Sequence, residues 1–142
     1  MKTNFEVIDN HALESAARYI DLHNNFDFVG IEYNIAKREV RLEWGKSPES
    51  WVDINEPSKL VFIHQEVSFL RIIEQEENSS IIDATCLGEL TFFPSTSRSI
   101  NSEIVSQRKP NLEDDILYFF ENGSLIRIHC EQINLSLIED RT

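Results

Sequence analysis

The sequence has few glycines, few cysteines and no long hydrophobic run, and each shortage excludes a class of protein. Only four glycines occur in 142 residues, too few for the glycine-rich loops that hold phosphate groups. Two cysteines, Cys86 and Cys130, do not make a disulfide framework. No apolar run approaches the ~20 residues of a membrane span. The first residues, MKTNFEVIDNHALE, lack the apolar core of a signal peptide, so we expect a cytoplasmic protein.

Basic residues are also scarce. Thirteen Lys and Arg stand against 25 Asp and Glu, which gives a net charge of −12. A phosphate backbone or an anionic membrane surface would repel such a chain, so we expect no direct binding of nucleic acid or membrane. The charge favours a basic protein partner, because opposite fields speed encounter. The alternative is that the negative charge serves only to keep the protein soluble.

The chain does contain enough apolar residues for a packed core. The hydrophobic fraction is 41% and includes nine Phe, which is typical of a globular protein. A chain of this length predicts one domain over residues 1–142. Residues 9–22 show apolar side chains at helical spacing, and Asp9 or Asn10 can cap the start. We therefore predict a helix there, ending at Asn24–Asn25.

Alternating and continuous apolar runs predict strands in the rest of the chain. Residues 29–35 and 40–44 alternate and predict a hairpin with one face in the core. Residues 60–75 fit two strands around a polar centre or one long bent strand, with a helix over 66–75 as a further alternative. Asn122–Gly123 predicts a type I′ hairpin turn, and the tail from 134 predicts an edge strand. The predicted fold is α+β and mostly β: one N-terminal helix packed on an antiparallel β-sandwich or partly open barrel.

No catalytic or metal-binding pattern stands out. His129 and Cys130 are adjacent in a predicted strand, so they point to opposite faces and cannot readily share a metal ion. We predict that Cys130 is buried and that His129 is at the surface. The sequence around Cys86 has no nucleophile elbow, so we predict that Cys86 is a structural thiol. A distant cluster of His64, His129 and Glu66 is left open. We expect no cofactor and no enzymatic activity.

Two features are candidates for contact with a partner. Two clusters of acids lie in predicted turns, where exposed carboxylates can meet a basic cleft; the alternative is ordinary solvated surface. Trp44 continues a core-facing pattern, whereas Trp51 lies in a loop and is a candidate interface anchor. The predicted partner-binding residues are Glu74, Glu76, Glu77, Glu113, Asp114, Asp115 and Trp51.

The order of segments resembles a known class of bacterial protein. The segments that carry the resemblance are HNNFDFVGIEYNIAKREVRLEW, LVFIHQEVSFLRI and LYFFENGSLIRIHCEQINLSL. This layout is similar to the small β-rich immunity proteins of bacterial contact-dependent growth inhibition and polymorphic toxin systems. Those proteins often begin the first hairpin with His-Asp, where this chain has His23–Asn24. The resemblance covers most of the chain in layout.

The resemblance implies a non-enzymatic inhibitor. Such a protein binds the toxic C-terminal domain of a cognate effector, in many cases a nuclease, and blocks its basic active-site cleft. The net charge of −12 fits such a partner independently. Two other functions are left open by the residues. One is a small-molecule-binding β-sandwich or barrel lined by Phe, and the other is an enzyme that uses His64 or His129 with nearby carboxylates.

Overall fold

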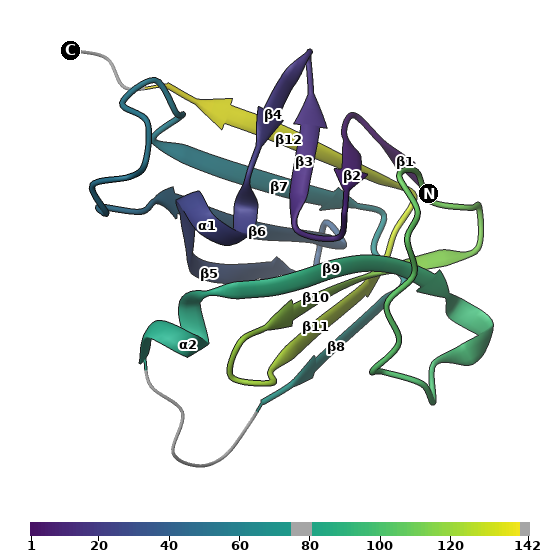
Figure 1. Cartoon of the computed structure of the whole chain (residues 1–142). Helices are drawn as coiled ribbons and strands as arrows, with labels where there is room; N and C mark the ends of the chain where they lie inside the picture. The colour runs from purple at the N-terminus through teal and green to yellow at the C-terminus, as the bar shows by residue number, and fades with distance from the viewer. Residues whose placement is uncertain (75–80, 140–142) are drawn as a thin grey trace.

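The protein is a mostly β structure with two short helices and one turn of 3-10 helix, seen in a computed structural model that describes residues 1–74 and 81–139 (Figure 1). The elements are β1 Lys2–Thr3, β2 Glu6–Ile8, β3 Ala12–Ser15, β4 Arg18–Ile20, α1 Leu22–Asn25, β5 Phe26–Asn34, β6 Glu39–Lys46, β7 Lys59–Gln65, β8 Phe69–Ile73, α2 Ile81–Thr85, β9 Leu87–Pro94, η1 Ser95–Ser97, β10 Asp114–Phe120, β11 Leu125–His129 and β12 Gln132–Ile138. The prediction of a mostly β chain is confirmed. Within the described ranges, neither helix has the length and apolar character needed to cross a bilayer.

The strands form three sheets rather than one closed ring. A five-stranded sheet has the order β1–β12–β7–β6–β5, and a four-stranded sheet the order β8–β11–β10–β9. A third sheet, β2–β3–β4, crosses in front of the five-stranded sheet in the view of Figure 1. Among the strands that the structure describes, all pairings are antiparallel except β1 with β12. Strand β12 pairs with β7 along its whole length, whereas β1 pairs only with Gln132 and Ile133, so the tail from Asn134 lies at the edge of the sheet as predicted.

Aromatic side chains join the two larger sheets. The ring of Trp44 on β6 lies 5.7 Å from that of Tyr118 on β10, measured between centroids. Phe62 on β7 lies 6.0 Å from the same tyrosine, and Phe28 lies 5.0 Å from Phe120. Trp44 has no exposed surface, which confirms its predicted place in the core. Each buried aromatic ring removes a large apolar area from water, so this layer holds the sheets together.

The predicted helix over residues 9–22 is wrong, because these residues form the β2–β3–β4 meander. Val7, Leu13 and Ile20 lie opposite one another in register, and all three are buried. The chain reverses at residues 9–10 and again at Ala16–Ala17, where all four residues have positive φ. Two consecutive left-handed residues are the mark of a type I′ turn, which fits the twist of paired strands. Alanine at such a turn gives no sequence signal, so apolar spacing was mistaken for a helical stripe.

The second meander turn offers a test of stability. Ala17 is exposed and has φ 64°, in the left-handed region that a Cβ disfavours. Ala17→Gly is expected to raise the free energy of unfolding by about 1 kcal/mol, measured by urea denaturation. As a matched control, Ala12→Gly in the buried part of β3 should lower it. A loss of stability in Ala17→Gly would contradict the left-handed turn.

The other hairpin predictions are confirmed in outline. Strands β5 and β6 pair across the turn that precedes Glu39, and β7 and β8 are two strands, which rules out a helix over 66–75. Strands β10 and β11 pair around Asn122–Gly123. In that turn only Gly123 has positive φ, and its N–H donates to the Phe120 carbonyl at 2.9 Å. The turn is therefore a type I turn followed by a left-handed glycine rather than the predicted type I′.

Candidate partner-binding site

The site that combines an exposed aromatic ring, acids and a hollow lies around α1. This helix has four residues and is capped at its start by Asp21. The Asp21 carboxylate accepts hydrogen bonds from the Asn24 backbone N–H at 3.0 Å and from the Asn24 side-chain amide at 2.8 Å. Leu22 is fully buried and anchors the helix in the core. The next residue, His23, is therefore held at the surface end of the turn, with about a third of its side chain exposed.

Trp51 stands at the rim of this hollow. It lies in the loop between β6 and β7 and is 66% exposed. Its indole Nε1–H donates to the Asn24 carbonyl at 3.3 Å, which fixes the ring against α1. The loop is tied down beside it, because the Ser47 N–H donates to the Asn25 carbonyl at 2.9 Å. An exposed indole with a fixed orientation costs little entropy on binding, as interface anchors require. The predicted exposure of Trp51 is confirmed.

Acidic side chains surround the hollow. The residues that line it are His23, Asn24, Asp27, Ser47, Pro48, Glu49, Trp51, Thr85 and Cys86. Burial raises the pKa of the Cys86 thiol, and the charges of Glu121, Asp27 and Asp83 raise it further. The carboxylates of Asp27 and Glu49 in the lining add negative charge at this end of the molecule. A positively charged group is favoured in such a hollow.

His23 and Cys86, which are distant in sequence, meet in this hollow. The Nδ1 atom of His23 lies 3.9 Å from the Cys86 sulfur and 3.8 Å from a carboxylate oxygen of Glu121. A histidine beside a thiol is the pattern of a cysteine nucleophile, but that chemistry needs a lowered thiol pKa. Here burial, and after it the neighbouring acids, raise the pKa of the thiol, which does not favour a thiolate nucleophile. No motif in the sequence indicated this meeting.

The histidines considered for an enzyme are placed where they serve the fold. His64 has no exposed surface and bridges two strands. Its Nδ1 lies 2.9 Å from the Val40 carbonyl, so it donates there, and Nε2 accepts from the Tyr118 hydroxyl at 2.9 Å. His129 contacts Asp115 instead, so the open possibility of a cluster with His64 is not realised. Among the described residues, the one group of three potential metal ligands is His23, Cys86 and Glu121.

Two of the acids predicted to face a partner are in the interior. Asp114 is 3% exposed and Asp115 is 0% exposed, because both begin β10 instead of lying in a turn. Asp114 caps the preceding loop and accepts from the Asn111 N–H at 2.7 Å. The prediction that these two carboxylates are exposed is wrong. A carboxylate without accessible surface cannot contact a partner that binds the folded protein.

Asp115 is instead the centre of a buried ionic network. Its Oδ2 accepts from Arg127 Nε at 2.7 Å and from Arg98 Nε at 3.0 Å. Its Oδ1 accepts from Arg98 Nη2 at 3.0 Å and lies 3.0 Å from His129 Nδ1. Arg127 also donates to the carbonyls of Ile100 and Pro94. The network therefore holds the segment between β9 and β10 onto β11.

The segment between β9 and β10 explains why side chains on both faces of β11 are buried. Residues Ile126, Ile128 and Cys130 belong to the core, which confirms the predicted burial of Cys130. The opposite face carries Arg127, which has no exposed surface, and His129, which is 22% exposed. His129 was predicted at the surface and is only partly so. The segment between β9 and β10 covers this charged face, because Arg127 donates to the carbonyls of Ile100 and Pro94.

The remaining predicted acids divide into two groups. Glu74 and Glu113 are exposed, as predicted for turn acids. Glu76 and Glu77 lie outside the described residues. Contact of these four residues with a partner stays a prediction.

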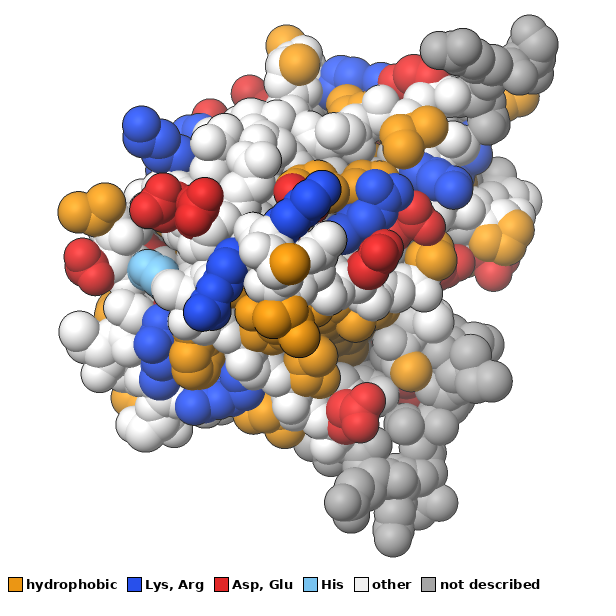
Figure 2. All heavy atoms as spheres, turned by 180° about the vertical axis from the view of Figure 1, so that it is seen from behind, with side chains coloured by type: hydrophobic (Ala, Val, Ile, Leu, Met, Phe, Trp, Pro, Cys, Tyr) orange, Lys and Arg blue, Asp and Glu red, His pale blue; other side chains and the backbone are white. Residues whose placement is uncertain are grey.

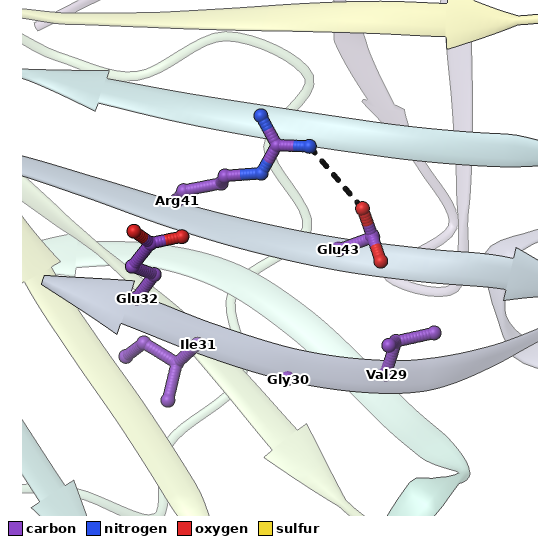
Figure 3. A pocket seen from close by; sticks show the side chains of 6 residues that line it. All are labelled: Val29, Gly30, Ile31, Glu32, Arg41 and Glu43. Atoms are coloured by element: carbon purple, nitrogen blue, oxygen red, sulfur yellow. Dashed lines mark hydrogen bonds and ion pairs between the residues drawn. The ribbon is translucent and has the colours of Figure 1, made fainter.

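A second exposed surface follows the edge strand β5. Its side chains Val29, Ile31 and Tyr33 are 61%, 36% and 37% exposed, although their alternation predicted a core face. Beside Val29 and Ile31 lies a shallow hollow whose other side carries Arg41 and Glu43, which are bonded to each other at 3.2 Å (Figure 3). Figure 2 shows hydrophobic side chains gathered on the face behind the view of Figure 1, close to Lys and Arg side chains. This surface is mixed in charge, so it is less suited to a basic partner than the hollow at α1.

Comparison with known proteins finds no matching family model, no matching curated protein and no matching solved structure.

Proposed function

We propose that this chain is an immunity protein that binds and neutralises a basic toxin domain, in the manner of a nuclease inhibitor. The observation that carries the proposal is the hollow at α1, where a fixed, two-thirds exposed Trp51 stands among acids of a chain with net charge −12. Steering by the acids would bring the basic active-site cleft of the toxin to this end. Burial of the indole in that cleft would then supply affinity.

The arrangement supports an inhibitor over an enzyme. The pKa of the Cys86 thiol is raised, and His64 has no access to solvent. The acids therefore act on a partner as charges and not as parts of a catalytic group. Inhibition by blocking needs only a complementary surface, which agrees with the function that the segment order implies.

A co-expression experiment tests the proposal directly. The C-terminal domain of the protein encoded immediately upstream would be expressed with and without this chain while cell growth is followed. The proposal expects growth arrest that this chain relieves. Absence of toxicity, or toxicity that this chain does not relieve, would overturn it.

Trp51 and the acids beside it should have separable effects on toxin binding. Trp51→Ala is expected to weaken the complex by about 2 kcal/mol or more, mainly through faster dissociation. Reversing Asp27 and Glu49 to Lys together should slow association about tenfold at low salt and reduce its salt dependence. Surface plasmon resonance at two salt concentrations measures both rates.

The stability of these variants and one further acid provide the controls. Because Trp51 is largely exposed, Trp51→Ala should change the free energy of unfolding by no more than about 0.5 kcal/mol. Glu113→Lys tests the exposed acid of the second predicted cluster. A loss of on-rate in Glu113→Lys, with none in the Asp27 and Glu49 variant, would move the interface away from α1.

A second candidate function rests on a different hollow. An apolar space of about 390 Å³ opens between β5, β8 and β11. Its lining includes Phe28, Ile31, Ile72 and Phe120, with Glu74 among its polar groups. This size and composition suit a small apolar ligand. Thermal melting with a panel of lipids and metabolites tests it, since a bound ligand raises the melting temperature.

A further inference from the structure

Three potential metal ligands of different type converge beside α1. His23 comes from α1, Cys86 from the junction of α2 and β9, and Glu121 from the turn between β10 and β11. Their nearest ligand atoms all lie within 4.8 Å of one another. The combination of imidazole, thiol and carboxylate is the donor set of borderline-soft divalent ions such as Zn²⁺.

The two separations from His23 are close to those around a tetrahedral ion. Ordinary zinc bond lengths place a ligand nitrogen about 3.5 Å from a thiolate sulfur and about 3.3 Å from a carboxylate oxygen. The structure has 3.9 Å between His23 Nδ1 and Cys86 Sγ, and 3.8 Å between His23 Nδ1 and the Glu121 oxygen. Closing these gaps needs shifts of about half an ångström, within the reach of side-chain rotation.

The backbone already holds two of the three ligands together. The Glu121 N–H donates to the Cys86 carbonyl at 2.9 Å, so the turn is fixed to the start of β9. His23 is placed by its own contact, since its Nδ1 lies 2.5 Å from the Leu87 carbonyl and donates a proton there. Loading a metal on Nδ1 would break this hydrogen bond, move the imidazole proton to Nε2 and release the Cys86 proton to solvent.

We propose that His23, Cys86 and Glu121 form a binding site for one divalent transition-metal ion, with Zn²⁺ as the preferred class. The charge of the surroundings favours a cation at this place, because Glu121 is itself a ligand and Asp27 lines the same hollow.

The site is open on one side. The side chains of His23 and Glu121 are 32% and 44% exposed, and Cys86 lines the hollow that Trp51 borders. Three protein ligands leave a fourth position for water or for a group of another molecule. The metal site does not depend on the proposed immunity function, because its ligands all belong to this chain.

Cobalt titration of the full chain tests the site. Co²⁺ is the probe because a bound thiolate gives a near-ultraviolet charge-transfer band and tetrahedral ligation gives visible bands. We expect saturation at one ion per chain and displacement of Co²⁺ by Zn²⁺. Cys86→Ser should abolish the charge-transfer band, since the other cysteine, Cys130, is 1% exposed.

Variants of the other two ligands, and of one acid outside the site as a control, complete the experiment. His23→Ala and Glu121→Gln are expected to weaken Co²⁺ binding by at least the about 10–100-fold that loss of a second-shell contact causes. Glu89→Gln removes an exposed acid of β9 outside the cluster and should leave affinity unchanged. Circular dichroism of each metal-free variant verifies folding. A wild-type chain that binds Co²⁺ without the charge-transfer band, or a band that persists in Cys86→Ser, would overturn the proposal.

Discussion

Replacing Asp115 by Asn is expected to lower the free energy of unfolding by about 3–5 kcal/mol. The change keeps the size of the side chain and removes its charge. Arg127, which is as fully buried as Asp115, would then carry a charge with no counterion at 2.7 Å. Removal of one partner of a buried ion pair is among the most destabilising single changes, because the remaining charge stays out of water.

Arg98 adds to the expected effect. It binds Asp115 through two nitrogens, and its guanidinium lies 3.8 Å from the centroid of the Phe69 ring. The charge of Asp115 therefore holds an arginine from the segment after β9 over β8 as well as one from β11. In Asp115→Asn we expect this segment to loosen, with faster amide exchange at Asn101 and its neighbours.

Urea denaturation of Asp115→Asn and of Glu113→Gln forms the matched test. Glu113 is an exposed acid only two residues away, so its change should cost no more than about 0.5 kcal/mol. A loss below about 1 kcal/mol in Asp115→Asn would contradict the buried network. A reduced on-rate for a partner with unchanged stability would restore the original prediction that Asp115 is an interface acid.

Acidification is expected to destabilise the fold through His64. Burial lowers the pKa of His64 to about 4, against an ordinary value of 6.5, and the hydrogen bonds to backbone carbonyls offset this only in part. Between these two values the unfolded chain binds a proton that the native state does not. The stabilisation is therefore complete above about pH 6.5 and is lost as the pH falls toward 4.

The linkage gives a magnitude that can be measured. From about pH 7.5 to about pH 5, His64 alone should cost about 2 kcal/mol of unfolding free energy. Urea denaturation at both pH values measures the wild type and His64→Gln, a variant that keeps one donor and one acceptor. The variant should show a pH dependence smaller by about 2 kcal/mol, while the other histidines contribute equally to both. Equal pH dependence in the two proteins would contradict burial of a neutral His64.

The hydrogen-bond geometry explains why protonation is costly. Nδ1 already donates to the Val40 carbonyl, and Nε2 accepts from the Tyr118 hydroxyl. A second proton would turn Nε2 into a donor and require the hydroxyl to rotate, while placing a charge in the aromatic layer. The charge and not the loss of a contact is the larger cost, because the ring has no access to water.

Local signals in the sequence located most strands. Alternation over residues 40–44 predicted β6 and its buried face, and Gly123 marked the β10–β11 turn. These signals work because side chains of one strand face alternate sides and because few residues accept a positive φ. The same alternation on β5 misled, because an irregularity at Val29 shifts the register with β6 and because an edge strand has one neighbour, which leaves Ile31 and Tyr33 partly uncovered.

The candidate site was only partly predictable. Trp51 was found from its place in a polar loop, where a large aromatic ring has no neighbours to bury it. The meeting of His23 with Cys86 and Glu121 joins residues about 60 and 100 positions apart in sequence, and pairing over such distances leaves no trace in a single sequence. The prediction that Asp115 is exposed was wrong for the same reason, because nothing in the local sequence shows that two arginines cover it.

By itself, the sequence determined the acidic charge, the largely β character and the turns with a glycine or a polar break, because these follow from composition and near neighbours. Only the tertiary structure decided that Ala16–Ala17 is a turn, that Asp115 is buried and that His23 faces Cys86. In each of these cases the free energy comes from contacts between distant segments. Burial of Leu13 and Ile20 outweighs the local cost of two left-handed alanines. Long-range contacts of this kind select the fold and create the site.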